Sequence, residues 1–196
     1  METSVARALE FDQDQALTSA MAVFRRLGYA GVSIKALEAE TGLSSGSIYN
    51  SFGSKEALFA RAVAHYNQIV VRQRLLTHLQ GKPAFAGLVS LFESLLDEPG
   101  GKAFGCLLTN SAIEFAGQET EASAALRAGF DLLQTGFTEA LLTLPQMTQP
   151  DAERGALRLL AFYQGLLVLI RNGHDKEALR VTIPPELKAI TGENDA

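Results

Sequence analysis

Apolar residues recur at intervals of three and four along almost the entire chain. Such spacing places them on one face of an α-helix, whereas a half-buried strand alternates apolar and polar residues. No alternating stretch of useful length is present in the sequence. The pattern therefore predicts an all-α protein, with helices delimited by frequent glycines, prolines and short polar residues.

The first helix has the clearest signals in the sequence. Asp12 can cap its start, and Leu17 and Phe24 belong to a single apolar stripe. Gly28 can adopt the left-handed conformation that ends many helices. We expect the helix to stop at Gly28 and Tyr29 to fold back towards Phe24.

Two shorter helices are predicted next. The second begins after Ser33 and stops at Gly42, and the third begins near residue 44 or 45. Ile48 and Phe52 lie one helical turn apart in the third helix and are expected to be buried together. The rest of that helix is polar.

A long fourth helix follows, capped by Ser54 and extending over residues 54–80. Leu58, Ala62 and Ile69 are expected to face inward along it. Further helices are predicted over about residues 83–96, 102–115, 120–144 and 150–172, with short ones after residues 175 and 184.

The second and third helices, joined at Thr41-Gly42-Leu43, have the layout of a helix-turn-helix. Gly42 permits the left-handed turn, and Leu43 can fill the angle between the helices. With Ile48 and Phe52 in the core, a polar set remains on the outer face: Ser45, Gly46, Ser47, Tyr49 and Asn50. Hydroxyls and phenols can bond phosphates, and an asparagine can read base edges. The outer face is therefore a candidate DNA-reading surface.

Lys55 lies at the start of the fourth helix, where the helix dipole disfavours a cation by about 0.3–1 kcal/mol. A phosphate would relieve this cost, because the backbone amides after Ser54 and the Lys55 ammonium can converge on one anion. Ser33 and Lys35 offer a second such arrangement. Helix-turn-helix geometry also occurs in proteins that never bind DNA, so the geometry alone leaves the function open.

At these residues the sequence resembles the TetR/AcrR family of bacterial transcriptional regulators. The similarity extends over about residues 11–66 and is densest at Thr41-Gly42-Leu43, at residues 46–52 and at residues 55–59. Gly46 departs from the pattern, because many members carry a bulkier residue there. The resemblance implies a homodimer that binds a palindromic double-stranded DNA operator, and a C-terminal domain in which a small-molecule effector binds and releases the DNA.

The resemblance also implies a domain division and a set of DNA-contacting residues. Residues 1–53 would form the DNA-binding domain, the helix over 54–80 would link it, and residues 54–196 would form the effector-binding and dimerisation domain. The expected DNA-binding residues are Ser33, Lys35, Ser44, Ser45, Ser47, Tyr49, Asn50 and Lys55.

The net charge of the chain is −5, from 17 basic and 22 acidic residues, which argues against binding through a large basic surface. We expect each subunit to neutralise about three phosphates, which gives a salt slope near −5 for two subunits. The single cysteine, the absence of a signal-peptide pattern and the lack of an apolar run of about 20 residues favour a cytoplasmic protein without a membrane segment.

One subunit presents one reading helix, so two half-sites about 34–36 Å apart require a dimer. The stretch from Leu159 to Ile170 is apolar nearly all round, interrupted chiefly by Gln164 and Gly165, and a partner subunit is a natural cover for it. We expect a four-helix interface built from the last two long helices of each subunit. The expected interface residues are Leu126, Phe130, Leu133, Phe137, Leu159, Phe162, Leu166 and Ile170. The alternative is that these side chains fill a monomeric core.

The remaining helices carry aromatic and aliphatic residues with a few isolated polar groups, which suits a largely apolar effector anchored by hydrogen bonds. The expected effector site comprises Tyr66, Phe92, Phe104, Leu107, Asn110, Tyr163 and Gln164. Cys106 could be a redox switch, although a lone cysteine near a helix start is usually inert.

No cofactor, metal site or enzymatic activity is expected. None of the three histidines has another histidine or a carboxylate at the spacing of metal ligands, and no catalytic motif is present. The competing interpretation is a helical ligand-binding or protein-interaction module that keeps the helix-turn-helix as a scaffold without sequence-specific DNA binding.

Overall fold

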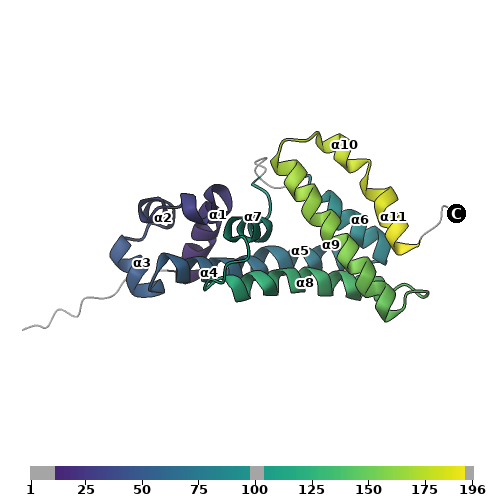
Figure 1. Ribbon diagram of the computed structural model, residues 1–196, viewed down its shortest axis with the longest axis horizontal. Helices are drawn as coiled ribbons and strands as arrows, with labels where there is room; N and C mark the ends of the chain where they lie inside the picture. Colours follow the sequence, from purple (N-terminus) through teal and green to yellow (C-terminus); the bar gives the residue numbers. More distant parts are fainter. Residues whose placement is uncertain (1–11, 98–103, 193–196) are drawn as a thin grey trace, which may run out of the picture.

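The computed structural model describes residues 12–97 and 104–192, and every regular element in these ranges is helical (Figure 1). This confirms the all-α prediction. None of the helices in the described ranges is long and apolar enough to span a membrane. The N-terminal helices are α1 (Gln13–Gly31), α2 (Ile34–Thr41), α3 (Ser45–Phe52) and α4 (Lys55–Tyr66), followed by the π-helix η1 (Asn67–Arg72) and α5 (Gln73–Leu79). The later helices are α6 (Ala84–Glu93), α7 (Leu107–Phe115), α8 (Ser123–Leu142), α9 (Gln149–Arg171), α10 (Lys176–Arg180) and α11 (Ile183–Thr191).

The N-terminal helices begin at the predicted caps. The Asp12 carboxylate accepts hydrogen bonds from the backbone amides of Asp14 and Gln15, at 3.0 and 3.2 Å. The hydroxyls of Ser33, Ser44 and Ser54 cap α2, α3 and α4 in the same way. Each cap satisfies amides that have no partner inside the helix.

The first helix differs from expectation at its end. Gly28 breaks α1 with φ 74° and ψ 166°, but a further helical turn follows over residues 29–31. Gly28 therefore makes a kink rather than a stop. The Tyr29 ring stacks on Phe24 with ring centroids 6.2 Å apart, as predicted.

The predicted fourth helix is a continuous rod made of α4, η1 and α5, which Figure 1 shows running alongside α8. The π-helical stretch has more residues per turn than an α-helix, so it rotates the helix face that follows it. Ile69, expected to face inward, is 42% exposed for this reason, while Asn67 and Val71 are buried. The inward prediction for Ile69 is wrong.

In the C-terminal part, α8 packs against α9, η1 and α5, while α6 and α11 pack against each other. Three glycines allow the close approaches. A Cβ atom at Gly129 would lie 2.5 Å from Asn67 Oδ1, and one at Gly155 would lie 2.7 Å from a Leu141 methyl carbon. A Cβ atom at Gly136 would likewise lie 3.0 Å from a Leu75 methyl carbon.

The eight side chains expected at a subunit interface are covered mainly within the single chain. Six of them are buried: Leu126, Leu133, Phe137, Leu159, Leu166 and Ile170. Phe130 and Phe162 are half-buried. The side chains pack inward because α8 and α9 bury their most apolar faces against each other and against neighbouring helices. The buried six cannot supply an exposed surface for a partner, which corrects the choice of face on these helices.

Candidate DNA-binding surface

The core beneath α3 fixes which of its residues face outward. Leu37 of α2 and Ile48 of α3 are fully buried, and Phe52 is 4% exposed. Because Ile48 and Phe52 hold one side of α3 in the core, the opposite side lies at the surface. In Figure 1, α2 and α3 lie at the end of the molecule opposite α10 and α11.

The angle between α2 and α3 is fixed by hydrogen bonds around Gly42, whose φ is 72°. The Thr41 hydroxyl donates to the Leu37 carbonyl at 2.7 Å and accepts from the Leu43 amide at 3.2 Å. The Glu38 carboxylate accepts from the Ser45 amide at 2.6 Å. Glu38 therefore ties the two helices together, a role that no local sequence pattern indicates.

The predicted DNA-binding residues of α3 divide into two groups. The Ser44 and Ser47 hydroxyls lie 3.0 Å apart, and Ser44 caps the helix by accepting from the Ser47 amide at 3.2 Å. Tyr49 is 47% exposed and Asn50 is exposed, and no described residue forms a hydrogen bond or ion pair with either side chain. Tyr49 and Asn50 are therefore the residues of α3 most available to a partner molecule.

Gly46 lies on the same exposed face of α3. The nearest atom to a Cβ built there is the Ser44 hydroxyl oxygen at 3.8 Å. A side chain would thus fit without displacing a neighbour. The glycine leaves a bare patch of backbone beside Tyr49 and Asn50.

Lys55 occupies the first turn of α4 and has a partner that the sequence did not indicate. Its ammonium nitrogen lies 4.3 Å from the centroid of the Tyr29 ring, a cation–π distance. Burial lowers the pKa of Lys55, and the nearby Glu114 carboxylate partly offsets this. The Tyr29 ring therefore offsets part of the cost of placing Lys55 at a helix start, and the phosphate contact stays a prediction.

Among the other cations of this region, Arg26 forms an ion pair with Glu40, and Arg61 lies over the Phe52 ring at 5.5 Å. Lys35 is exposed at the start of α2, next to the capping Ser33. Lys35 and Lys55, with the backbone amides at the starts of α2 and α4, thus form the part of the candidate surface that can bind anions.

The residues predicted to bind an effector lie in different surroundings. Phe92 and Tyr163 pack edge to face, 5.7 Å apart, in an aromatic cluster with Phe137 and Phe162. Leu107 and Tyr66 are buried, and the Tyr66 hydroxyl donates to the Cys106 sulfur at 3.7 Å. Burial raises the pKa of Tyr66 well above its ordinary value, so this phenol stays protonated.

The polar members of that set have mixed surroundings. The Asn110 amide donates to the Phe104 carbonyl at 3.0 Å, and the Gln164 carbonyl oxygen accepts from the Thr109 hydroxyl. The Gln164 amide nitrogen is buried and has no hydrogen-bond partner among the described residues. The same holds for the Oδ1 atom of Asn67, a residue that no sequence pattern indicates.

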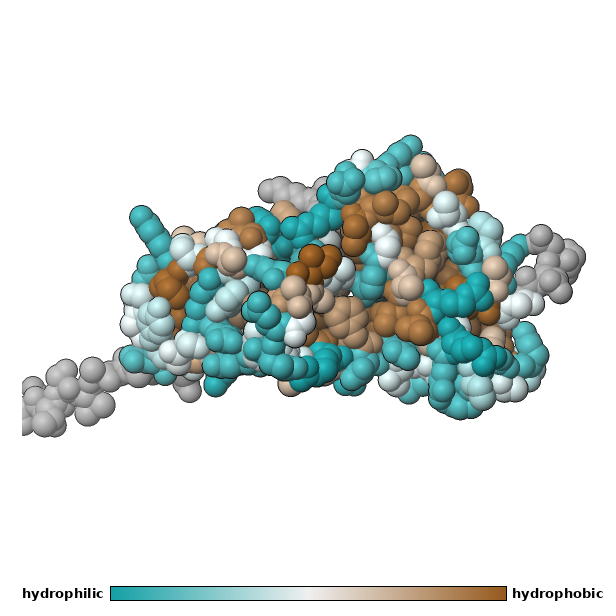
Figure 2. Space-filling model, viewed as in Figure 1, coloured by the Kyte–Doolittle hydropathy of each residue, from teal (hydrophilic) through white to brown (hydrophobic). Residues whose placement is uncertain are grey.

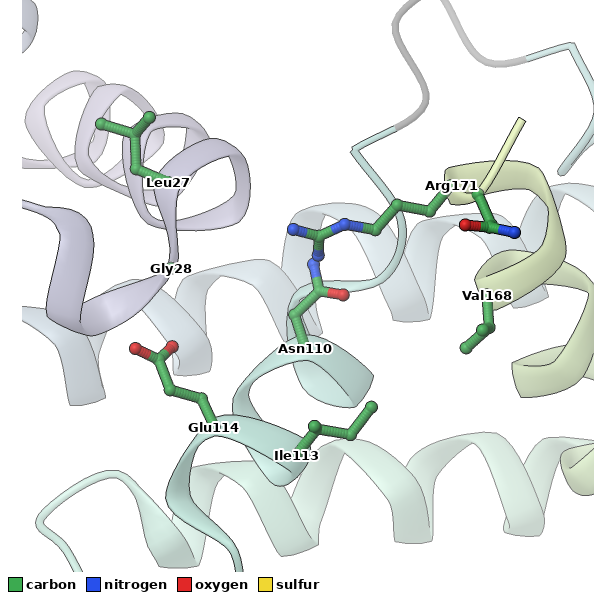
Figure 3. A pocket seen from close by; sticks show the side chains of 8 residues that line it. Leu27, Gly28, Asn110, Ile113, Glu114, Val168 and Arg171 are labelled. Atoms are coloured by element: carbon green, nitrogen blue, oxygen red, sulfur yellow. The ribbon is translucent and has the colours of Figure 1, made fainter.

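An open cleft of about 550 Å³ lies where α1, α7 and α9 meet (Figure 3). Its lining residues are Leu27, Gly28, Asn110, Ile113, Glu114, Val168, Arg171 and Asn172. Only Asn110 belongs to the predicted effector set, because the cleft forms from three helices that are distant in sequence. In the described ranges, no group of three or more His, Cys, Asp or Glu side chains comes together to hold a metal ion.

A helix-turn-helix with a polar outer face, joined to further helices by the rod of α4, η1 and α5, is the layout found in many DNA-binding regulatory proteins. Residues 16–62 match the sequence profile of the bacterial regulatory proteins of the tetR family. A structure of the TetR family regulator CifR, a cysteine mutant in complex with 26-bp double-strand operator DNA, is 31% identical and has a TM-score of 0.77. That alignment covers 93% of this chain and 98% of CifR. The chain belongs to the TetR family of transcriptional regulators.

Two further relatives agree with this membership. The uncharacterised HTH-type transcriptional regulator YezE of Bacillus subtilis (strain 168) is 28% identical over 162 residues, which cover 81% of this chain and 83% of YezE. A TetR transcriptional regulator from Chloroflexus aurantiacus is 27% identical, with a TM-score of 0.69 and 91% of each chain covered.

Proposed function

We propose that this protein is a non-enzymatic, ligand-responsive repressor that binds a palindromic operator as a homodimer and leaves it when an effector binds. The observation that carries the proposal is the exposure of Tyr49 and Asn50 on a helix whose other face is locked in the core. Such a helix can enter a major groove without rearranging the domain. The operator-bound structure of CifR supports the same mode of binding.

The proposed contacts divide by role. Asn50 reads a base edge, and Tyr49 contacts the sugar-phosphate backbone. Lys35 and Lys55 contact phosphates together with the amides of α2 and α4, and the three serines near α3 provide close approach. The proposed domains are residues 1–53 for DNA binding and 54–196 for effector binding and dimerisation, with the helix over 54–80 linking them.

A second copy of the chain is the proposed partner of an exposed stripe on α9. Leu157 is 58% exposed and Val168 is 47% exposed, and the exposed Ala161 and Gly165 lie between them on the same face. A Cβ at Gly165 would have no neighbour within 4 Å, so this face is open at its centre. Two such stripes crossing would bring small residues together at the centre and cover the larger ones. The dimer is required to read two half-sites.

The proposed effector is largely apolar with one hydrogen-bond donor and one acceptor. Asn67 Oδ1 and the Gln164 amide nitrogen are buried polar atoms without partners, and leaving such atoms unbonded costs about 1–3 kcal/mol each. An effector that bonds them would recover this energy. Asn67 begins the π-helical segment of the rod, so binding there acts on the element that leads to the DNA-binding domain.

Selection of bound fragments from random duplex DNA tests the proposal directly, because it reports both specificity and twofold symmetry. The Tyr49→Ala and Lys55→Ala variants should lose operator binding while keeping their folding and dimerisation. Lys82→Ala removes an exposed cation from the turn before α6 and serves as the matched control. Affinity for the selected operator should fall roughly a thousandfold between 50 and 200 mM salt.

The competing interpretation, a helical ligand-binding or protein-interaction module without specific DNA binding, makes the opposite forecast. It requires that no duplex is enriched and that both substitutions are without effect. Under the leading proposal, an effector that lowers operator affinity a hundredfold must favour the DNA-free state of the protein by about 2.7 kcal/mol.

A further inference from the structure

The kink at Gly28 leaves two backbone amides at the start of a new helical turn. In an uninterrupted helix, the amides of Tyr29 and Ala30 would bond carbonyls of the preceding turn. They donate instead to the two carboxylate oxygens of Glu114, at 2.8 and 2.6 Å. Glu114 therefore caps this turn in the way that an acidic residue caps a helix start, but from a distant helix.

Glu114 belongs to α7, in the second domain, and Figure 3 shows its carboxylate pointing towards the kink. Hydrogen bonds from amides to a carboxylate are stronger than those between neutral groups. A Cβ at Gly28 would lie 3.1 Å from Glu114 Oε2, so the glycine gives the carboxylate room to reach both amides. The contact joins the DNA-binding domain to the second domain.

The Tyr29 ring lies between this contact and the candidate DNA surface. Its centroid is 5.1 Å from that of Phe59 and 5.3 Å from that of Phe115. The Lys55 ammonium lies over the same ring at 4.3 Å. A shift of the Tyr29 backbone would therefore move the platform on which Lys55 rests.

We propose that Glu114 is a positioning residue for DNA recognition: it holds Tyr29, and Tyr29 holds the Lys55 ammonium where an operator phosphate binds. The inference rests on the proposed function. Because Glu114 is carried by α7, a movement of α7 in the second domain changes the position of Lys55. The contact is thus a link by which the state of the second domain reaches the DNA-binding surface.

Glu114→Gln tests the link, since the variant keeps the size of the side chain but removes its charge and one acceptor. We expect operator affinity to fall about tenfold at constant salt. The matched control is Glu119→Gln, which removes the same charge from an exposed residue paired with Arg127. Loss of a negative charge by itself favours DNA binding, so simple electrostatics predicts tighter binding for both variants. Tighter or unchanged binding of Glu114→Gln would overturn the proposal.

A double-mutant cycle asks whether Glu114 acts through Lys55. At a low salt concentration, where the weak residual binding of Lys55→Ala can be measured, Glu114→Gln should have little further effect on operator affinity in the Lys55→Ala background, because the group it positions is already gone. Additive losses would overturn the proposed route. If Glu114→Gln folds poorly, Glu114→Asp replaces it, since the shorter side chain keeps the charge but not the reach.

Hydrogen exchange at the amides of Tyr29 and Ala30 provides a readout in the free protein. Exchange of both amides should accelerate in Glu114→Gln and not in Glu119→Gln, and equal exchange would overturn the proposal. A wild-type protein that selects no duplex would refute the proposed function itself. A wild-type protein that binds its operator no better than Glu114→Gln does would refute only the positioning role.

Discussion

Replacing Gly28 by alanine perturbs both the backbone of α1 and the contact with Glu114. With φ 74° and ψ 166°, Gly28 occupies a region that is essentially restricted to glycine, and an alanine there costs about 1–3 kcal/mol. The added Cβ would also lie 3.1 Å from the Glu114 carboxylate. Displacing that carboxylate weakens two charge-assisted hydrogen bonds, which adds about 1–3 kcal/mol.

The two effects together predict a loss of about 4 kcal/mol in the free energy of unfolding. For a chain of this length, each kcal/mol corresponds to about 2–4 °C in melting temperature, so Gly28→Ala should lower Tm by roughly 8–16 °C. Thermal unfolding followed by circular dichroism measures the shift. Wild type and variant must be compared at equal protein concentration, because a dimer's Tm depends on it.

Gly42→Ala is the control for backbone strain alone. Gly42 also has a positive φ, 72°, but its ψ of 6° is left-handed helical, and a Cβ there would have no neighbour within 4 Å. Gly42→Ala should therefore lower the free energy of unfolding by only about 1–2 kcal/mol. If Gly28→Ala proves no more destabilising than Gly42→Ala, the reasoning about the kink and its carboxylate is refuted.

Three other predictions concern α5, α8 and α9. Leu157→Glu, on the exposed stripe of α9, should shift the protein from dimer to monomer in sedimentation equilibrium; an unchanged mass would refute that interface. Gly129→Ala should destabilise the fold by about 1–3 kcal/mol in urea unfolding, since the new Cβ would meet Asn67 Oδ1 at 2.5 Å, whereas Gly165→Ala, in open space, should not. Burial and two nearby cations lower the pKa of His78 below 6.5, so the unfolded chain takes up its proton first as pH falls. Stability should therefore decrease below about pH 6.5, and less so in His78→Gln; equal pH profiles would contradict this.

Local signals predicted the DNA-binding region well. Caps at Asp12 and Ser54, the glycine at position 42 and the pair Ile48 and Phe52 all act within one helical turn or one short connection. For the same reason, the exposed face of α3 could be assigned from the sequence.

Predictions that depend on packing between distant segments were less successful. Apolar residues on α8 and α9 were assigned to a subunit interface, but periodicity does not say whether a side chain is covered by its own chain or by a partner. Ile69 was placed inward because the sequence carries no clear sign of the π-helical turn that rotates it outward. The effector residues stay a prediction, because composition does not show which polar atoms lack partners.

Short-range chemistry in the chain was enough to specify the helices, the turn between α2 and α3, and the polar face that identifies the family. Three features depend on tertiary contacts alone. They are the buried polar atoms of Asn67 and Gln164 that lack a hydrogen-bond partner, the cleft between α1, α7 and α9, and the hydrogen bonds of Glu114 to amides some 85 residues away. The physical reason is distance along the chain: caps and periodicity involve neighbours, whereas these features arise only when remote helices meet.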